Sequence, residues 1–311
     1  MTQQRSAVLS GLTATASVFD EYAKLDSFYT DSDLLPPLIR SSYNAVLGYV
    51  AYFLTDAKMN GRTSVLIDVG TASATLIEMA LELFPDAQCI GVEPSEQMTL
   101  FARKKFDSGL GYGNVSILQG TAQELPEMVS EGSASVVTMH NAAHYLSDED
   151  LSRAIGHFRS VSAESGGLVM TLFKPDYDFR SLLQANIGYM EDTSRRWLAM
   201  QLNPSREIIS LVNAVSDVVS RVQRGQLDFA GFTDRLNGLL SLTGKDHESA
   251  LPVRLIRSAI NALPLEQQLT PNIYRHAVER LQEMLQPYYQ IKEFRRNHYS
   301  GTQHFVVGVA L

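Results

Sequence analysis

Short apolar segments rich in β-branched residues alternate with helical patterns along the first half of this chain, and they restrict its fold more than any other feature. The segments are Ser64–Gly70, Gln88–Glu93, Asn114–Gln119, Ala134–Met139 and Leu168–Phe173. A continuous apolar run of this length is typical of a strand buried on both faces. Strands separated by helices pair in parallel. The sequence therefore predicts an α/β fold with a doubly wound parallel sheet.

The rest of the chain predicts helices on both sides of this region and two strands at its end. We expect an N-terminal helical lid segment over residues 1–60, a sheet-bearing core over 61–178 and 287–311, and a helical insertion after the fifth strand over 179–286. Segments Tyr289–Arg296 and His304–Ala310 are separated by a polar turn and predict a closing antiparallel hairpin. Gly166 and Gly167 predict a turn before the fifth strand.

Composition narrows the classes of function. The formal net charge of −8 disfavours general binding to nucleic acid. The single cysteine, Cys89, rules out an internal disulfide, and no cluster has the spacing of a zinc site. The N-terminus lacks a secretory h-region, and the longest apolar stretch, residues 45–54, is too short to span a bilayer. We therefore expect a cytoplasmic protein with no membrane or metal partner; the sequence sets no oligomeric state.

Acidic residues end the first two predicted strands. Asp68 precedes a turn of small residues that starts at Gly70, and such a turn lets a ligand approach the backbone and the next helix N-terminus. Glu93 ends the second strand, where a carboxylate can accept hydrogen bonds from both hydroxyls of a ribose. The alternatives are a capping acid for Asp68 and a solvated loop acid for Glu93. Together they predict a nucleoside-containing ligand at the carboxyl edge of the sheet.

Several motifs together resemble the class I S-adenosylmethionine-dependent methyltransferases. They are Asp68-Val69-Gly70-Thr71-Ala72-Ser73-Ala74, Gly91-Val92-Glu93-Pro94-Ser95-Glu96-Gln97-Met98, Gly120-Thr121-Ala122-Gln123-Glu124-Leu125-Pro126 and His140-Asn141-Ala142-Ala143-His144-Tyr145-Leu146. The resemblance implies a Rossmann-like core and S-adenosylmethionine as cosubstrate. The implied cosubstrate-binding residues are Asp68, Gly70, Thr71, Ala72, Ser73, Glu93, Pro94, Met98, Thr121, Ala122, His140, Asn141 and the lid residue Tyr22.

The sequence departs from the family pattern at three of these positions. Ala72 and Ala74 stand where the family has further glycines, so the first turn should be less free. Thr121 stands where the family usually has the aspartate that receives the adenine amino group. A threonine hydroxyl can still accept that hydrogen bond, without a charge.

Three residues after the fourth and fifth strands are candidates for the chemistry. His140 could act as a base near neutral pH, or it could be a hydrogen-bonded structural histidine. Asn141 could bind the carboxylate or the ammonium of the methionine moiety. The Tyr177 ring could hold a sulfonium by cation–π attraction, or it could simply pack.

The resemblance leaves three classes of function open. The first is methyl transfer to a small molecule, in secondary metabolism. The second is intramolecular displacement, in which the amine of S-adenosylmethionine attacks its own γ-carbon to give azetidine-2-carboxylate and methylthioadenosine, as in the small cyclases. The third is a non-catalytic binding subunit with a degenerate site. The fold alone does not choose among these.

Overall fold

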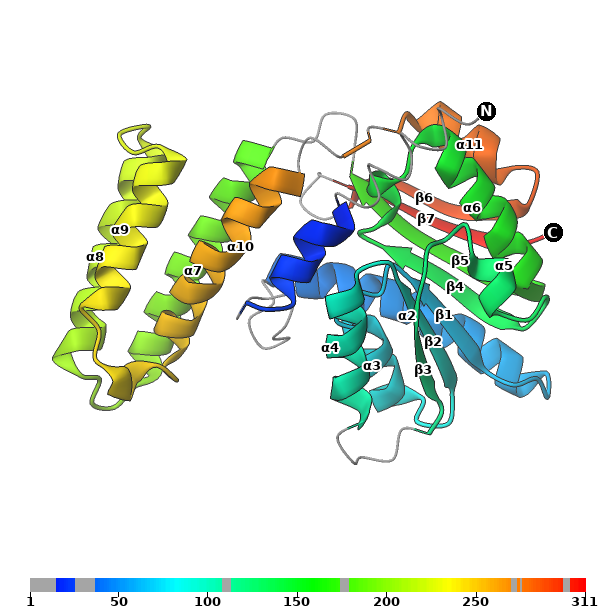
Figure 1. The fold of residues 1–311 in the computed structure, drawn as a ribbon, viewed down its shortest axis with the longest axis horizontal. Helices are drawn as coiled ribbons and strands as arrows, with labels where there is room; N and C mark the ends of the chain where they lie inside the picture. Colours follow the sequence, from blue (N-terminus) through cyan, green and yellow to red (C-terminus); the bar gives the residue numbers. More distant parts are fainter. Residues whose placement is uncertain are drawn as a thin grey trace. The chain divides into compact units, whose positions relative to one another are not determined.

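The computed structural model describes residues 15–25, 37–107, 113–173, 179–269, 273–274, 276–298 and 303–311. Two compact units make up the chain (Figure 1). The core unit comprises Met1–Lys24, Leu38–Tyr177 and Pro271–Leu311, and the helical unit comprises Leu25–Pro37 and Asp178–Thr270. Among the described residues, no helix is both long and apolar enough to cross a membrane.

The described part of the core unit forms a seven-stranded sheet with the order β3-β2-β1-β4-β5-β7-β6. Its strands are β1 (Val65–Val69), β2 (Gln88–Glu93), β3 (Val115–Gln119), β4 (Ala134–His140), β5 (Ser162–Phe173), β6 (Tyr289–His298) and β7 (Gln303–Ala310). The first five pair in parallel, and β7 lies antiparallel between β5 and β6. The predicted strands and closing hairpin are confirmed. The strand order reverses between β1 and β4, and in open α/β sheets ligands bind beyond the carboxyl ends of the strands at such a reversal.

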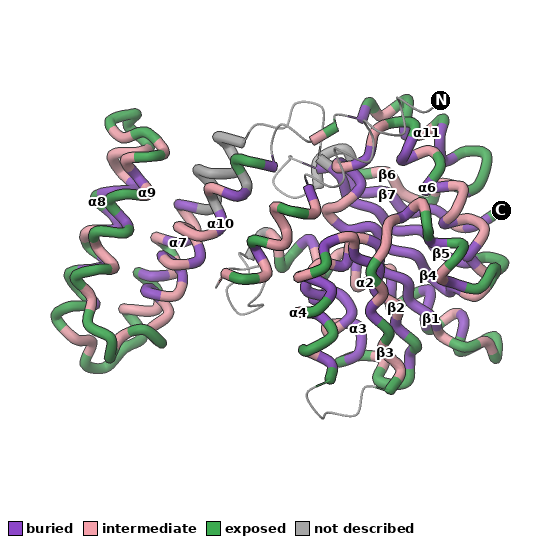
Figure 2. Tube along the Cα trace, in the orientation of Figure 1, coloured by how far each residue is buried: buried purple, intermediate pink, exposed green. Residues whose placement is uncertain are grey.

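Helices cover both faces of the sheet. One apolar cluster joins it to α2 (Pro37–Met59), α3 (Thr75–Leu83) and α4 (Glu96–Asp107). The other joins it to α5 (Leu125–Met128), α6 (Asp148–Val161) and α11 (Val278–Leu285). Every residue of β1 and β4 is buried, as expected for strands covered on both sides (Figure 2). The core unit resumes at Pro271, ahead of the expected residue 287, because α11 packs its apolar side on the sheet.

The prediction that Gly166 and Gly167 form a turn before the fifth strand is wrong. They lie inside β5 and do not form the turn that precedes it. A Cβ atom on Gly167 would come within 2.3 Å of the Phe53 ring, so this glycine lets α2 pack closely against the strand. Close approach of a neighbouring side chain is the usual reason for glycine within a strand.

The described part of the helical unit contains four long helices: α7 (Phe179–Met200), α8 (Arg206–Gln223), α9 (Phe229–Ser241) and α10 (Leu251–Leu269). Their apolar sides share one cluster. Ser205 and Asp228 accept hydrogen bonds at the first turns of α8 and α9, as N-cap residues do. The described residues also form two 3₁₀ turns, η2 (Ala143–Tyr145) in the core unit and η3 (Lys245–His247) in the helical unit, and residues 15–22 form a further helix of the core unit.

Candidate functional site

Asp68 lies near the carboxyl end of β1, where it is almost fully buried. Its two carboxylate oxygens accept hydrogen bonds from the Thr71 hydroxyl at 2.7 Å and the Thr138 hydroxyl at 2.6 Å. Burial raises the pKa of Asp68 to about 6, although the two hydroxyl groups favour the ionised form. The residue therefore ties the first turn to β4 at the point where the strand order reverses.

The turn after β1 contains three residues in the left-handed backbone region. They are Gly70 at φ 71°, Ala72 at φ 46° and Ala74 at φ 56°. A Cβ atom on Gly70 would come within 2.4 Å of the Ala142 side chain, so the turn fits tightly beneath the segment that follows β4. The two alanines that replace the family's glycines thus keep a conformation that glycine adopts without strain.

Glu93 at the end of β2 binds the same turn. Its Oε2 accepts from the Ala72 backbone N–H at 2.8 Å and its Oε1 from the Ser95 N–H at 2.9 Å. The residue is only 3% exposed, and burial raises its pKa to about 7, against the effect of the two N–H donors. An ionised carboxylate has about four lone-pair sites, so it can still accept the two hydroxyls of a ribose.

A hydrogen-bond network links the ends of β4, β5 and β7. His140 Nδ1 lies 2.7 Å from the Thr171 hydroxyl, and His140 Nε2 lies 3.2 Å from Asn141 Nδ2. Asn141, at φ 57°, donates its backbone N–H to Thr171 and accepts from Thr171 and from Gln303 at its Oδ1. The Tyr43 ring of α2 packs edge-on against His140, with 4.4 Å between ring centroids. Both predicted residues are therefore held rigidly.

The helix over residues 15–22 packs above the same edge of the sheet. Asp20 accepts from the Ser95 hydroxyl at 2.7 Å and from the Gln97 backbone N–H at 2.9 Å, at the start of α4. Phe19 meets the Tyr145 ring, which follows β4, and Tyr22 is fully buried. This helix (dark blue in Figure 1) therefore contacts both the start of α4 and the turn η2 that follows β4.

The structure places the remaining predicted residues as follows. Ala72 and Pro94 are half-buried, whereas Thr71, Ser73, Met98 and Ala122 are buried. Thr121 donates its hydroxyl and its backbone N–H to Glu124, and the hydroxyl oxygen can still accept a hydrogen bond. Tyr177 lies outside the described residues.

Sequence reasoning missed four residues that contact this site: Asp20, Thr138, Thr171 and Gln303. None of them belongs to a motif. The only available signal was the segment Phe19-Asp20-Glu21-Tyr22, in which two carboxylates stand between aromatic residues.

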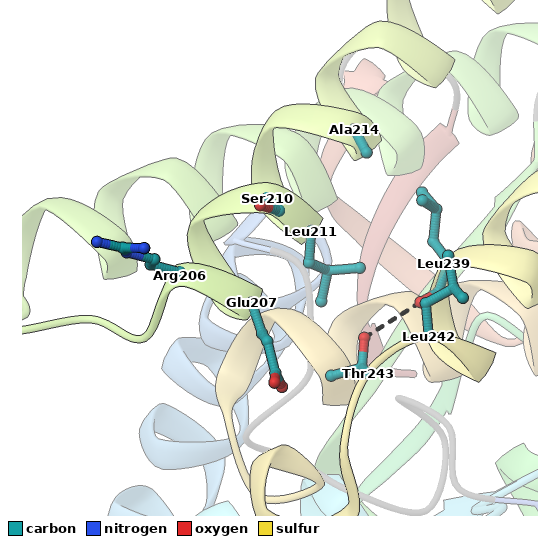
Figure 3. A pocket seen from close by; sticks show the side chains of 8 residues that line it. All are labelled: Arg206, Glu207, Ser210, Leu211, Ala214, Leu239, Leu242 and Thr243. Carbon is teal, nitrogen blue, oxygen red and sulfur yellow. Dashed lines mark hydrogen bonds between the residues drawn. The ribbon is translucent and has the colours of Figure 1, made fainter.

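A separate cavity of about 330 Å³ lies in the helical unit, between α8 and α9 (Figure 3). Leucine and alanine side chains form its walls, and Glu207 extends beside Thr243 at one side. Its lining residues are Arg206, Glu207, Ser210, Leu211, Ala214, Leu239, Leu242 and Thr243. None of the sequence-predicted site residues lines it. Nearby, Arg195 and Arg196 of α7 pair with Glu191 and Asp192 on their own helix.

The described residues contain no group of three or more His, Cys, Asp or Glu side chains that could hold a metal ion. Cys89 is a free, buried thiol, and burial raises its pKa to about 12. The site therefore offers carboxylates, amides, hydroxyls and one imidazole.

Residues 66–166, about a third of the chain, match the family model described as a methyltransferase domain. No curated protein sequence matches the chain significantly. Solved structures that resemble it include magnesium protoporphyrin IX methyltransferase from Synechocystis PCC 6803 with bound SAH, at 14% identity and TM-score 0.47, covering 88% of this chain and 86% of that one. A SAM-dependent methyltransferase from Aquifex aeolicus shares 10% identity at TM-score 0.43, covering 80% and 82%.

A third similar structure, the pyocyanin biosynthetic protein PhzM, shares 12% identity at TM-score 0.41, covering 80% of this chain and 51% of that one. At TM-scores below 0.5 these resemblances carry no argument about function, and the likeness to methyltransferases comes from the family model over residues 66–166. The core unit has a Rossmann-like fold, and residues 66–166 within it are similar to a methyltransferase domain.

Proposed function

We propose that this protein transfers the methyl group of S-adenosylmethionine to a small molecule in secondary metabolism. The observation that carries the proposal is Glu93, buried at the end of β2 and hydrogen-bonded to the turn that follows β1. A carboxylate in this position accepts ribose hydroxyls in Rossmann-like folds. A raised pKa in the ligand-free protein supports the role, because ligand hydroxyls would stabilise the charge that burial opposes.

The residues around Glu93 fit the other parts of the cosubstrate. The left-handed turn from Gly70 to Ala74 brings backbone close to the ligand space. Met98 and Pro94 offer apolar surface for the adenine, and Thr121 offers a hydroxyl oxygen to its amino group. The buried lid residue Tyr22 would close the pocket from above.

Methyl transfer needs only an aligned nucleophile. The acceptor atom attacks the sulfonium methyl in line, the new bond to carbon forms as the S–CH₃ bond breaks, and the electron pair stays on sulfur as S-adenosylhomocysteine is released. Orientation supplies most of the rate enhancement. We propose His140 as the base for an acceptor that must lose a proton, with Asn141 and Tyr177 orienting the cosubstrate around the sulfonium. Because Asn141 occupies His140 Nε2 at rest, the amide must yield that nitrogen to the acceptor first.

A small acceptor fits the site better than a macromolecule. His140 is 7% exposed and Glu93 is 3% exposed, so the side chains proposed to act as base and to bind the ribose lie beneath the protein surface. The net charge of −8 also opposes a polyanionic acceptor. We therefore infer an acceptor that enters the core unit as a free small molecule.

Product analysis tests the proposal. The purified protein is incubated with S-adenosylmethionine, alone and with pools of amines, phenols, carboxylic acids and enolisable ketones, and the products are identified by mass spectrometry. Acceptor-dependent S-adenosylhomocysteine together with a methylated acceptor is the expected result. If S-adenosylmethionine alone gave methylthioadenosine and azetidine-2-carboxylate above the level without protein, the reaction would be intramolecular cyclisation and not methyl transfer.

A further inference from the structure

Gln303 at the start of β7 belongs to the site network, although it lies outside the motifs found in the sequence. It pairs across the sheet with Phe173 at the end of β5, so it lies at the same edge as His140 and Asn141. Its Nε2 donates to Asn141 Oδ1 at 2.6 Å. The residue is 1% exposed, and its Oε1 is buried with no hydrogen-bond partner among the described residues.

The hydrogens of the network can be assigned from its contacts. Asn141 Oδ1 accepts from both Thr171 and Gln303, so an incoming ammonium finds that oxygen already occupied. Asn141 Nδ2 can only donate, and it donates one hydrogen to His140 Nε2. His140 therefore carries its proton on Nδ1 and donates it to Thr171. One hydrogen of Asn141 Nδ2 is left without a contact in the described structure.

An acceptor and a donor of two neighbouring amide groups thus lack a partner among the described residues. The Gln303 amide has a free acceptor and the Asn141 amide has a free donor. A buried carbonyl oxygen without a partner is costly, and in native structures such an atom often meets a ligand. The α-amino acid end of S-adenosylmethionine carries an ammonium donor and a carboxylate acceptor on one carbon atom, which matches this pair.

We propose that Gln303 Oε1 accepts a hydrogen bond from the α-ammonium group of the cosubstrate, while Asn141 Nδ2 donates to its α-carboxylate. The inference rests on the proposed function and adds a binding residue from β7. It also decides which end of the amino acid Asn141 binds, because the Asn141 oxygen is already held by Thr171 and Gln303.

Calorimetric titration tests the contact without knowledge of the acceptor. The probes are S-adenosylhomocysteine, its analogue with hydrogen in place of the α-amino group, and methylthioadenosine, which lacks the amino acid. Gln303→Leu should weaken S-adenosylhomocysteine binding about ten- to hundredfold, the range for a hydrogen bond to a charged group. It should leave the other two probes within about twofold of the wild-type protein, since neither has the ammonium.

A matched control and a second variant separate binding from folding. Gln290 is an exposed glutamine of β6 paired near the far end of β7, so Gln290→Leu should bind every probe as the wild-type protein does. Gln303→Met, which keeps the length of the side chain, should repeat the result if the leucine variant fails to fold. Equal losses for all three probes, or unchanged S-adenosylhomocysteine binding, would overturn this inference alone. A wild-type protein that binds no probe would overturn the proposed function as well.

Discussion

Glu93 gives the proposed cosubstrate site a pH dependence that follows from its burial. The pKa of this carboxyl is about 7 in the ligand-free protein, well above its ordinary value. Only the ionised form can accept both ribose hydroxyls. Binding should therefore raise the ionised fraction and release a proton, and affinity should fall as the pH falls through 7. The α-amino and carboxyl groups of S-adenosylhomocysteine do not change charge in this range, so the protein is the source of the change.

The expected size of the change in affinity follows from the ionised fraction of Glu93. Between pH 8 and pH 6 this fraction falls from about nine tenths to about one tenth, so the dissociation constant should rise about tenfold, or about 1.4 kcal/mol. The slope below pH 6 should approach tenfold per pH unit. Calorimetry at several pH values, in buffers of different ionisation enthalpy, measures both the affinity and the released proton. Methylthioadenosine keeps the ribose and should show the same step.

A substitution at Glu93 provides the control. Glu93→Gln places an amide nitrogen against a backbone N–H of either Ala72 or Ser95, so it loses one of the two hydrogen bonds and should bind more weakly at pH 8. Glu93→Ala should weaken binding by about 1–3 kcal/mol at that pH. Neither variant should retain the step near pH 7. A wild-type affinity that is constant from pH 6 to pH 8, or a step that survives in Glu93→Gln, would refute the assignment of this carboxylate to the ribose.

Three further predictions concern the same edge of the sheet. Ala72→Gly should raise the free energy of unfolding by about 0.5–1 kcal/mol, because relief of left-handed strain exceeds the added entropy of the unfolded chain. Ala74→Gly also loses a fully buried methyl group and should not become more stable. Urea unfolding followed by circular dichroism measures both, and a destabilised Ala72→Gly variant would contradict the prediction. Because the pKa of Asp68 is raised, ionising this residue lowers the stability of the folded protein as the pH rises from about 4 to about 6. Asp68→Asn should therefore be more stable than the wild-type protein at pH 8, by up to about 3 kcal/mol, and should lose most of that advantage at pH 4. Melting temperatures at both pH values test this, and an equal difference at the two would contradict it. Asp20→Ala removes two hydrogen bonds that hold helix 15–22. Amide hydrogen exchange in that helix should become about tenfold faster or more, while exchange in β1 stays unchanged. Unchanged exchange in the helix would show that other contacts hold it.

The sheet could be predicted from the sequence because its signals are local. Each parallel strand is a short apolar run, and Asp68 and Glu93 mark two strand ends directly. The closing hairpin is equally local, since a polar turn separates two β-rich segments. The double glycine misled the prediction because glycine marks turns more often than it marks tight packing within a strand, and the Phe53 ring that requires Gly167 lies on a distant helix.

The network around Asn141 could not be predicted in the same way. Thr171 and Gln303 reach it only through the antiparallel register of β5 and β7, which an apolar pattern does not encode at the level of single side chains. The sequence placed His140 and Asn141 together, but it could not show that both ring nitrogens of His140 are engaged. The contact from Asp20 to Ser95 joins segments 75 residues apart, and no local rule anticipates it.

Hydrogen–deuterium exchange with and without S-adenosylhomocysteine tests most directly where the ligand binds. The account predicts slower exchange over residues 68–75 and 93–98, at the ends of β1 and β2, and in helix 15–22 above them. Residues 206–243, which include every residue that lines the cavity of the helical unit, should exchange at the same rate in both samples. Protection confined to residues 206–243, or none at all at a saturating concentration, would contradict a cosubstrate site at the carboxyl edge of the sheet.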